Sequence, residues 1–235
     1  MPSGKTALKI RKVHRYLGLF LGIQFLMWTI SGLYFSWTDI DDIHGDQYKN
    51  LTPESVELSG LVSPTEISHR TPITQVEIRE INNHPYYLIN KKQLYNATTG
   101  AIKKALNKQE ALSIAKRHMR ADLEVASIEE ISDTDKHHEY RNKLLPAYVI
   151  SCESTNELKA YVSIQDATFQ TVRHRSWRWF DFLWMTHTMD YEGRDNFNTT
   201  VLRVFSLLGL ITVMSGFALW YVSSPSIRAI RRKRK

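Results

Sequence analysis

The sequence predicts an α+β domain outside the cytoplasm, flanked by two transmembrane α-helices. Two apolar runs, residues 17–38 and 204–224, lack any charged side chain over 22 and 21 positions. A helix of about 20 apolar residues is long enough to cross the core of a bilayer. The segment between the runs contains alternating, strand-like patterns and one stretch with helical periodicity. Clusters of Lys and Arg adjoin both runs on the side facing the chain ends.

The net charge of +7 is distributed very unevenly. Residues 1–16 carry five Lys or Arg and residues 225–235 carry six, with no acid in either segment. Without these 11 and Arg203, 19 basic residues remain against 24 acidic ones, a net charge of −5. The positive-inside rule then predicts cytoplasmic termini, with residues from 39 to about 200 on the far side. Basic residues beside spans have anionic lipid as their nearest partner, so we expect no nucleic-acid binding.

The first apolar run is expected to be an uncleaved span. A signal peptide has an apolar region of roughly 7 to 15 residues followed by an A-x-A-like site, and this run is longer and lacks such a site. The single cysteine, Cys152, cannot form an internal disulfide. The central domain must therefore be stabilised by its own hydrophobic core.

The central region divides into two halves with related patterns. Residues 76–95 are typical of a β-meander, which closes on the turn Asn96-Ala-Thr-Thr-Gly100. Residues 107–119 are predicted to be a helix, with Asn107 and Glu110 forming a capping box. Strands are expected at 123–128, 146–152 and 158–164, before a second turn that begins at Asp166. The first half is thus interpreted as a degenerate copy of the second, and we expect the two halves to pack together.

Just after the first span, a short acidic stretch from Asp39 to Asp46 includes His44. Its spacing does not fit a calcium loop, and the favoured interpretation is a solvated exit from the membrane. Farther on, His137-His138-Glu139 could bind a metal or a ferric chelate, although adjacent histidines on a charged loop are usually solvated.

An amphipathic helix is predicted where the chain returns to the membrane. Within residues 176–189, Trp177, Phe180, Trp184 and His187 recur at steps of three, four and three, which places them on one face. Aromatic residues of this kind anchor helices in the membrane interface. The predicted organisation is a cytoplasmic segment 1–16, a span 17–38, a central region 39–175, an interfacial helix and loop 176–200, a span 201–224 and a cytoplasmic tail 225–235.

Several motifs in the chain resemble a known family. H-R-Y-L-G-L from His14, S-G-L-Y-F from Ser31 and W-M-T-H-T-M-D-Y from Trp184 resemble PepSY-associated transmembrane proteins. The helix and strands that end in the Asp166 turn resemble a PepSY domain. The resemblance implies a bacterial inner-membrane protein with a periplasmic domain, often near siderophore uptake. Some members bind b-type haem through membrane-border histidines and reduce ferric siderophores, and others resemble protease-inhibitory or regulatory proteins. Larger relatives carry four spans, whereas this chain has two.

The first candidate site is His14 with Gly18 and Gly22. Residues four apart share a helix face, so the imidazole stands at one end of a ridge of bare backbone. A flat haem can lie against a helix where side chains are missing, as at glycines. Imidazole is a usual axial ligand of haem iron. The alternative is that Gly18 and Gly22 form a helix-packing motif and that His14 sits among lipid headgroups. The family resemblance favours the ligand interpretation.

The second candidate is His187, whose predicted helix face points toward apolar surroundings. A buried imidazole requires a partner, so either coordination of haem iron or a hydrogen bond to Asp190 or a backbone group is expected. His14 and His187 are predicted to lie at opposite membrane faces, separated by roughly the ~30 Å thickness of the hydrocarbon, and cannot share one iron. A twofold dimer would pair each histidine with its own copy, meeting along Gly18 and Gly22. Another subunit of the same family could serve as well.

Other residues of the spans are assigned supporting roles. Gln24 is the strongly polar side chain in the middle of the first span and is expected to bond across a helix interface or to a cofactor edge. In the second span, a stripe of mostly small residues is expected to make a close helix contact: Ser206, Gly209, Val213, Gly216 and Trp220. The chain has no G-x-G-x-x-G sequence, so we expect no nicotinamide or flavin site. Electrons would come from quinol or a separate cytoplasmic reductase.

The leading interpretation is a protein that carries electrons through haem b to ferric iron or a ferric siderophore, which would make it a reductase. Two alternatives remain open. One is a cofactor-free, membrane-anchored module that binds or regulates a periplasmic partner such as a protease. The other is an accessory subunit of an uptake complex. The visible absorption spectrum distinguishes the first interpretation from the other two.

Overall fold

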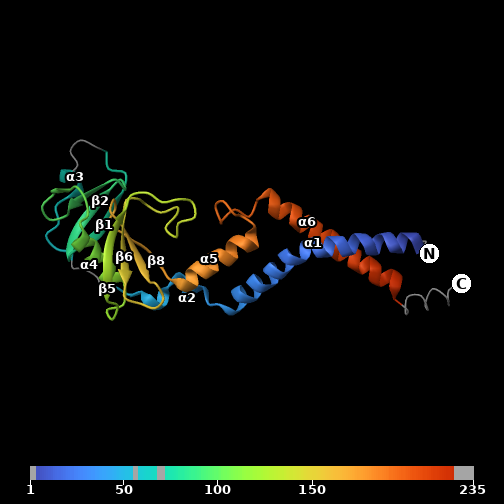
Figure 1. Ribbon diagram of the computed structural model, residues 1–235. Coiled ribbons are helices and arrows are strands. Elements are labelled where there is room, and N and C mark those ends of the chain that lie inside the picture. The colour runs from blue at the N-terminus through green and yellow to red at the C-terminus, as the bar shows by residue number, and fades with distance from the viewer. Residues whose placement is uncertain (1–3, 55–57, 68–71, 225–235) are drawn as a thin grey trace. The chain divides into compact units, whose positions relative to one another are not determined.

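The computed structural model describes residues 4–54, 58–67 and 72–224, and these divide into two compact units. The helical unit contains the described residues up to 37 and from 181 onward, and the α+β unit contains those from 38 to 180. Two long apolar helices thus flank two antiparallel sheets in the sequence (Figure 1), and the predicted fold class is confirmed.

Two helices in the helical unit are long and apolar enough to cross a membrane. Helix α1 covers Gly4–Trp37 and helix α6 covers Thr200–Ser223, and their candidate spans are Leu8–Trp37 and Thr200–Tyr221. Only 11% of the most apolar window of each helix is buried within the protein. A core helix of a soluble protein would be largely covered, whereas these side chains face outward as lipid contact requires. Helix α1 begins well before the predicted span, inside the basic N-terminal segment.

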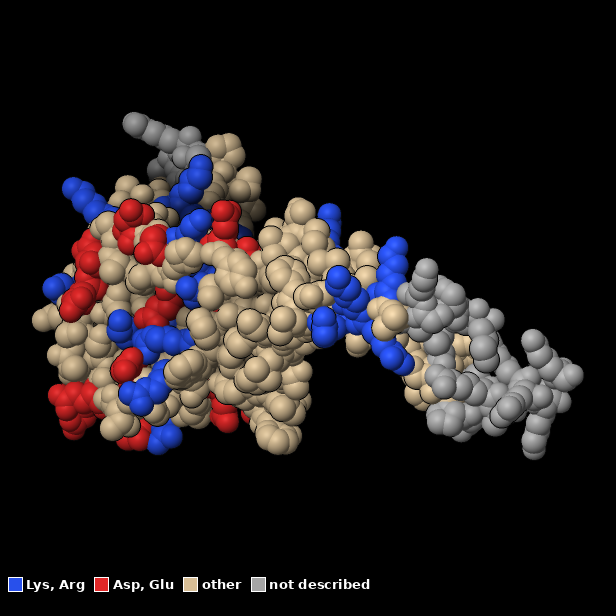
Figure 2. All heavy atoms as spheres, turned by 45° about the vertical axis from the view of Figure 1, so that its right-hand side comes forward, with Lys and Arg blue, Asp and Glu red and all other residues tan. Residues whose placement is uncertain are grey.

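The basic residues of α1 are concentrated before its apolar part. Lys9, Arg11, Lys12 and Arg15 are all exposed. In Figure 2 a group of blue side chains accordingly stands beside a tan, uncharged surface of the helical unit, whereas the α+β unit carries both signs of charge. The candidate span therefore has a sharp polar border at this end.

The contact between α1 and α6 uses small residues of α6, as expected, but on a face that only partly matches the predicted stripe. A Cβ atom on Gly209 would lie 3.2 Å from the Phe25 ring, and one on Gly216 would lie 3.4 Å from Cε1 of His14. Phe205 stacks against Phe20 with ring centroids 5.8 Å apart. The prediction was wrong for three members of the stripe, which are exposed: Ser206, Val213 and Trp220. The actual contact follows Phe205, Gly209, Thr212 and Gly216.

The first half of the α+β unit is a four-stranded antiparallel sheet in the order β1-β2-β3-β4. Asn82 and Asn83 both have positive φ and form the two-residue turn between β1 and β2. The side chain of Asn96 accepts hydrogen bonds from the N–H groups of Thr98 and Thr99, and Gly100 has φ of 72°. The strands are β1 (Val76–Ile81), β2 (His84–Ile89), β3 (Gln93–Asn96) and β4 (Ile102–Lys103).

The second half repeats this sheet order as β5-β6-β7-β8 and adds helix α4 (Lys108–His118) before it. The predicted capping box is present, because Asn107 Oδ1 accepts from the Glu110 N–H and Glu110 Oε2 accepts from the Asn107 N–H, both at 2.9 Å. Asp166 repeats the turn made by Asn96, accepting from Thr168. The strands are β5 (Val125–Ile131), β6 (Ala147–Cys152), β7 (Lys159–Ser163) and β8 (Phe169–Arg173).

One hydrophobic core joins the two sheets through α4. It combines Leu88 of the first sheet, Ile114 of α4 and Ile150 of the second sheet, each nearly inaccessible to solvent. In the first half, the described helix before the sheet is only the single turn α3 (Pro64–Ile67). The two halves therefore share a sheet topology, and the helix of the second half supplies packing to both.

The segment after α1 packs on the α+β unit instead of forming the solvated exit that the sequence suggested. Residues Ile40–His44 form the short helix α2 and Asp46–Tyr48 a 3₁₀ turn, η1. Ile43 is buried, and its carbonyl accepts from Nε2 of His174 at 3.2 Å. Gly45 has φ of 80° and lies so close to Val172 that a Cβ would approach it to 3.3 Å. Asp39, Asp41 and Asp42 remain exposed, as predicted.

Helix α5 (Arg175–Thr188) is the predicted amphipathic helix, and it begins in the α+β unit and ends in the helical unit. Its first half is held by Glu139, which accepts from Arg178 at 2.6 Å and from the Tyr161 hydroxyl at 2.6 Å. Burial would raise the pKa of Glu139, but these hydrogen bonds outweigh burial and leave the pKa below its ordinary value. The four residues of the predicted face are half-buried: Trp177, Phe180, Trp184 and His187.

The capping box gives a direct test of the α4 assignment. Asn107→Ala removes the acceptor for the Glu110 N–H and should destabilise the unit by about 1 kcal/mol, whereas Asn107→Ser should be nearly neutral. Hydrogen exchange of the α4 amides in the full-length protein measures the effect. Unchanged exchange in the alanine variant would contradict this role of the cap.

The buried His174 should make the α+β unit sensitive to acid. Burial lowers the pKa of His174 below its ordinary value of 6.5, so the unfolded chain binds the proton more readily than the folded one. Its stabilising contribution is therefore complete above pH 6.5 and is lost as the pH falls toward the folded-state pKa.

The measurement is the melting temperature at pH 7.5 and at pH 5.5. His174→Phe should lose hydrogen bonding but show a smaller drop between the two pH values than the parent protein. His84→Ala, which changes an exposed histidine, should leave the drop unchanged. An equal drop in the phenylalanine variant would assign the acid sensitivity to other groups.

Candidate functional site

Each of the two predicted histidines is paired with a serine from another helix. His14 Nδ1 of α1 lies 2.7 Å from Ser215 Oγ of α6. His187 Nδ1 of α5 lies 2.7 Å from Ser31 Oγ of α1. Both serines precede a glycine, so the Ser215-Gly216 and Ser31-Gly32 steps play the same part at two places in the helical unit.

The hydrogen bonds of the serines are compatible with one tautomer of both imidazoles. Ser31 Oγ lies 2.7 Å from the carbonyl of Met27, and Ser215 Oγ lies 2.7 Å from the carbonyl of Thr212, and each can donate there. A serine hydroxyl has one hydrogen, so an Oγ that donates to the carbonyl accepts from the histidine. In that arrangement the neutral imidazole would carry its proton on Nδ1 and a lone pair on Nε2.

Neither Nε2 atom has a hydrogen-bond partner within the part of the chain that the structure describes. A neutral imidazole with Nδ1–H bound to an acceptor and an unprotonated Nε2 is the form that coordinates metals. The ligand role of the two histidines stays a prediction, and their hydrogen bonds to serine are compatible with it.

The last carbonyl groups of α5, near His187, accept hydrogen bonds from polar side chains of α1. Gln24 Nε2 donates to the carbonyl of Thr186 at 3.1 Å, and Trp28 Nε1 donates to the carbonyl of His187 at 2.8 Å. The last carbonyls of a helix lack intrahelical partners, and in apolar surroundings such groups need a donor. Gln24 therefore bonds across a helix interface, one of the two roles predicted for it.

Aromatic rings surround the His187 imidazole. Phe35 lies 5.6 Å from it with the ring planes at 67°, and Trp28 lies 6.4 Å away. Trp184 packs edge-on against Phe35 and against Phe197. The sequence-based alternative was a hydrogen bond from His187 to Asp190 or to a backbone group. His187 does have a hydrogen-bond partner, but it is Ser31, and Asp190 accepts from the backbone N–H groups of the following loop.

The two histidine–serine pairs are well separated along α1. His14 and Ser31 lie 17 positions apart in one helix, which at 1.5 Å per residue amounts to about 25 Å. Both belong to a stripe of half-buried or buried residues at heptad-like spacing: His14, Leu17, Leu21, Gln24, Trp28, Ser31 and Phe35. The first part of this stripe faces α6 and the last part faces α5.

Gly18 and Gly22 lie beside this stripe and contact neither helix. A Cβ atom added to either glycine would meet nothing within 4 Å. The two glycines thus do not mediate the contact between α1 and α6. Their surface next to His14 is open, and the roles predicted for it, a haem seat or a contact with a second copy, stay predictions.

The loop candidate at His137-His138-Glu139 is accounted for by protein contacts. Glu139 is bound by Arg178 and Tyr161, and His138 Nδ1 accepts from the Tyr140 N–H at 3.1 Å. In residues 4–54, 58–67 and 72–224, no three His, Cys, Asp or Glu side chains gather as metal ligands.

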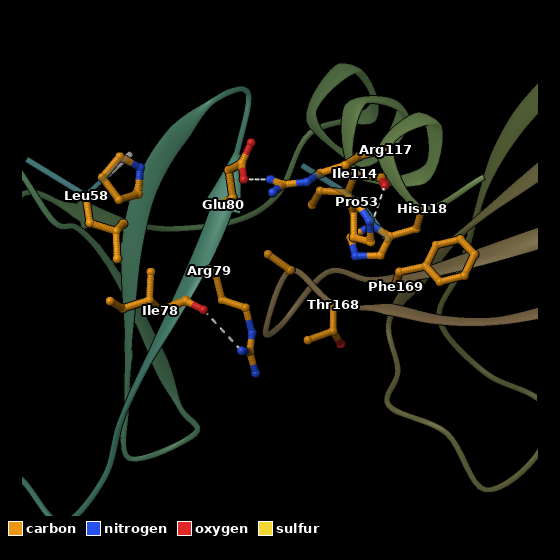
Figure 3. A pocket seen from close by; sticks show the side chains of 12 residues that line it. Pro53, Leu58, Ile78, Arg79, Glu80, Ile114, Arg117, His118, Thr168 and Phe169 are labelled. Atoms are coloured by element: carbon orange, nitrogen blue, oxygen red, sulfur yellow. Dashed lines mark hydrogen bonds and ion pairs between the residues drawn. The ribbon is translucent and has the colours of Figure 1, made fainter. Parts of the chain in front are cut away.

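The α+β unit contains a pocket of about 400 Å³ between β1, α4 and the turn before β8. Figure 3 shows Arg117 of α4 reaching toward Glu80 of β1, with which it forms an ion pair. His118 stacks on Phe169 with ring centroids 5.3 Å apart, and Arg79 extends along the opposite wall. The sequence contained no signal for this pocket, because its walls come from segments far apart in the chain.

The serines were also missed as partners of the histidines. Ser31 is separated from His187 by 156 positions, and Ser215 from His14 by 201. The available signal was the repeated Ser-Gly step in the two apolar runs. A single sequence does not indicate which histidine each step would face.

The chain was then compared with known proteins. The sequence pattern of the PepSY-associated TM region matches residues 2–223. No curated protein and no solved structure gives a significant match. The match covers both candidate spans, both histidine–serine pairs and the whole α+β unit.

Proposed function

This chain belongs to the PepSY-associated TM region family, and from that premise we propose that it carries electrons across a membrane through b-type haem held by His14 and His187. Two candidate spans make it a membrane protein. The observation that carries the proposal is the 2.7 Å contact of each imidazole Nδ1 with a serine Oγ that can also donate to a helix carbonyl. In that arrangement a neutral imidazole would carry its proton on Nδ1 and offer the lone pair of Nε2 to iron.

The chemistry of these side chains suits the binding of haem b. Haem iron takes neutral imidazole as an axial ligand, and a hydrogen bond at Nδ1 is the usual support for such a ligand. The open surface at Gly18 and Gly22 beside His14 and the aromatic rings beside His187 suit an apolar macrocycle. When bound, haem would supply one-electron redox chemistry.

If two imidazoles held each iron, the second would come from another copy or another subunit. The two histidines lie about 25 Å apart along α1, too far to ligate one iron. A second copy related by a twofold axis would bring His14 to His14 and His187 to His187, because such an interface is self-complementary. Two copies would then hold two haems, one near each end of the spans. Another subunit of the family could take the place of the second copy.

The charge distribution supports an orientation of the protein in the membrane. With the basic ends of both helices in the cytoplasm, His14 lies at the cytoplasmic border and the α+β unit is periplasmic. Electrons would enter near His14 from quinol or from a cytoplasmic reductase and leave near His187. The acceptor would be ferric iron, free or in a siderophore, and each Fe³⁺ takes up one electron to become Fe²⁺.

Purified full-length protein from haem-replete cells should show a Soret band. His14→Ala and His187→Ala should each remove one of the two haems from the dimer, since each histidine serves one site. The double variant should contain none. The measurement is haem per chain from the absorption spectrum, and His84→Ala is the matched control on an exposed histidine.

The proposal is wrong if the parent protein contains no haem under these conditions. It is also wrong if both single variants retain the full haem content and the spectrum of the parent. Elution volume on size exclusion separates a loss of ligand from a loss of folding.

The pocket of the α+β unit favours a second candidate function, in which a cofactor-free module binds a periplasmic protein such as a protease. Its lining includes apolar side chains, among them Ile78 and Phe169. Among the described residues, the buried Nε of Arg79 has no hydrogen-bond partner, so a peptide carbonyl could accept from it. Protein without a Soret band, together with a stable partner lost in Ile78→Asp but kept in Ile102→Asp, would support this function instead.

A further inference from the structure

We propose that Ser31 and Ser215 are positioning residues, which hold His187 and His14 in the ligand tautomer and set the redox potential of the iron they bind. This inference rests on the proposed function for its redox part. The structural part concerns the free protein alone. Neither serine contacts the space beyond Nε2, so each acts through its histidine.

The serine of each histidine–serine pair has a single hydroxyl proton to donate. Ser31 Oγ contacts the carbonyls of Met27 at 2.7 Å and Trp28 at 3.2 Å, in addition to His187 Nδ1. With its single proton directed at the carbonyls, an unprotonated Nδ1 would face the oxygen with lone pair against lone pair. When the Ser31 proton points to a carbonyl, the backbone of α1 thereby favours the Nδ1–H tautomer of His187 on α5.

Packing restrains the orientation of both imidazole rings. Gly216 brings the backbone of α6 so close to His14 that a Cβ there would lie 3.4 Å from Cε1. Phe35 and Trp28 pack around the ring of His187. With one nitrogen bonded and the ring packed, the direction of the Nε2 lone pair is fixed before any ligand binds.

The hydrogen bond at Nδ1 also affects how strongly Nε2 donates electrons to a bound iron. An acceptor on Nδ1–H makes the imidazole a stronger electron donor at Nε2, which favours the ferric over the ferrous state. Removing the serine hydroxyl should therefore raise the midpoint potential and weaken ligation. Loss of such a supporting hydrogen bond typically costs 10- to 100-fold in affinity.

The two serines differ in exposure, and this predicts unequal effects. Ser31 is fully buried, whereas Ser215 is only partly buried and lines a groove with Lys9, Ile10 and Val13. Lys9 places that groove at the polar border of the helices, where water can enter. A water molecule can replace the Ser215 hydroxyl as acceptor but has no access to the Ser31 position. The loss should therefore be larger for Ser31→Ala than for Ser215→Ala.

The test uses full-length protein in detergent, labelled with ¹⁵N at histidine, with and without added haem. In the free protein, ¹⁵N shifts should report Nδ1–H for His14 and His187, and Ser31→Ala should convert His187 to a mixture of tautomers. With haem, Ser31→Ala should weaken binding at the His187 site by about 10- to 100-fold and raise its midpoint potential. Ser31→Cys, which keeps the volume with a poorer acceptor, should resemble the alanine variant.

Matched controls change exposed serines on the same helices. Ser36→Ala on α1 removes a hydroxyl that donates to the Leu33 carbonyl. Ser206→Ala removes the hydroxyl of an exposed serine on α6. Both variants should leave the ¹⁵N shifts of the histidines and the midpoint potential of the haem unchanged. Ser215→Thr keeps a hydroxyl and should show the same shifts and potential as the parent protein.

The outcomes distinguish this inference from the proposed function. Unchanged tautomers and potential in Ser31→Ala and Ser215→Ala would overturn the role of the serines even if haem binds. A parent protein that takes up no haem would refute the proposed function, and the shifts of the free protein would still decide whether the serines set the tautomers.

Discussion

Polar groups inside a bilayer must be satisfied by the protein itself, and the arrangement of α1, α5 and α6 follows from that constraint. Gln24 and Trp28 supply donors to the last carbonyls of α5. Ser31 and Ser215 each lie within hydrogen-bond distance of a backbone carbonyl and of a histidine. Within the described residues, the Nε2 atoms of His14 and His187 have no hydrogen-bond partner, and the proposed function starts from these two atoms.

The same constraint explains the shape of the stripe on α1. A heptad-like row of residues can face two different neighbours in succession, provided that each neighbour covers a separate length of the helix. His14 and Phe25 meet α6, where Gly209 and Gly216 permit a close approach. Gln24 and the part from Trp28 to Phe35 meet α5. One helix thereby contributes a histidine to one pair and a serine to the other.

Local features of the chain could be predicted well from the sequence. The lack of charge in two long runs indicated the candidate spans, the Asn107 and Glu110 pair indicated the start of α4, and the spacing from Trp177 to His187 indicated the face of α5. The predictions that failed depended on distant partners. Small residues on α6 fit two adjacent helix faces, and contacts with α1, such as the stacking of Phe205 on Phe20, decide which face is used. The burial of Ile43 likewise depends on β8 and His174, 131 positions away.

The central claim is that the two histidines bind haem iron as pairs from two copies, and the haem content and spin state of purified protein test it most directly. The account predicts one haem per chain and an electron paramagnetic resonance spectrum of low-spin ferric haem with two imidazole ligands, because two copies share two sites. Protein free of haem, or haem in a high-spin state with a single imidazole, would contradict it.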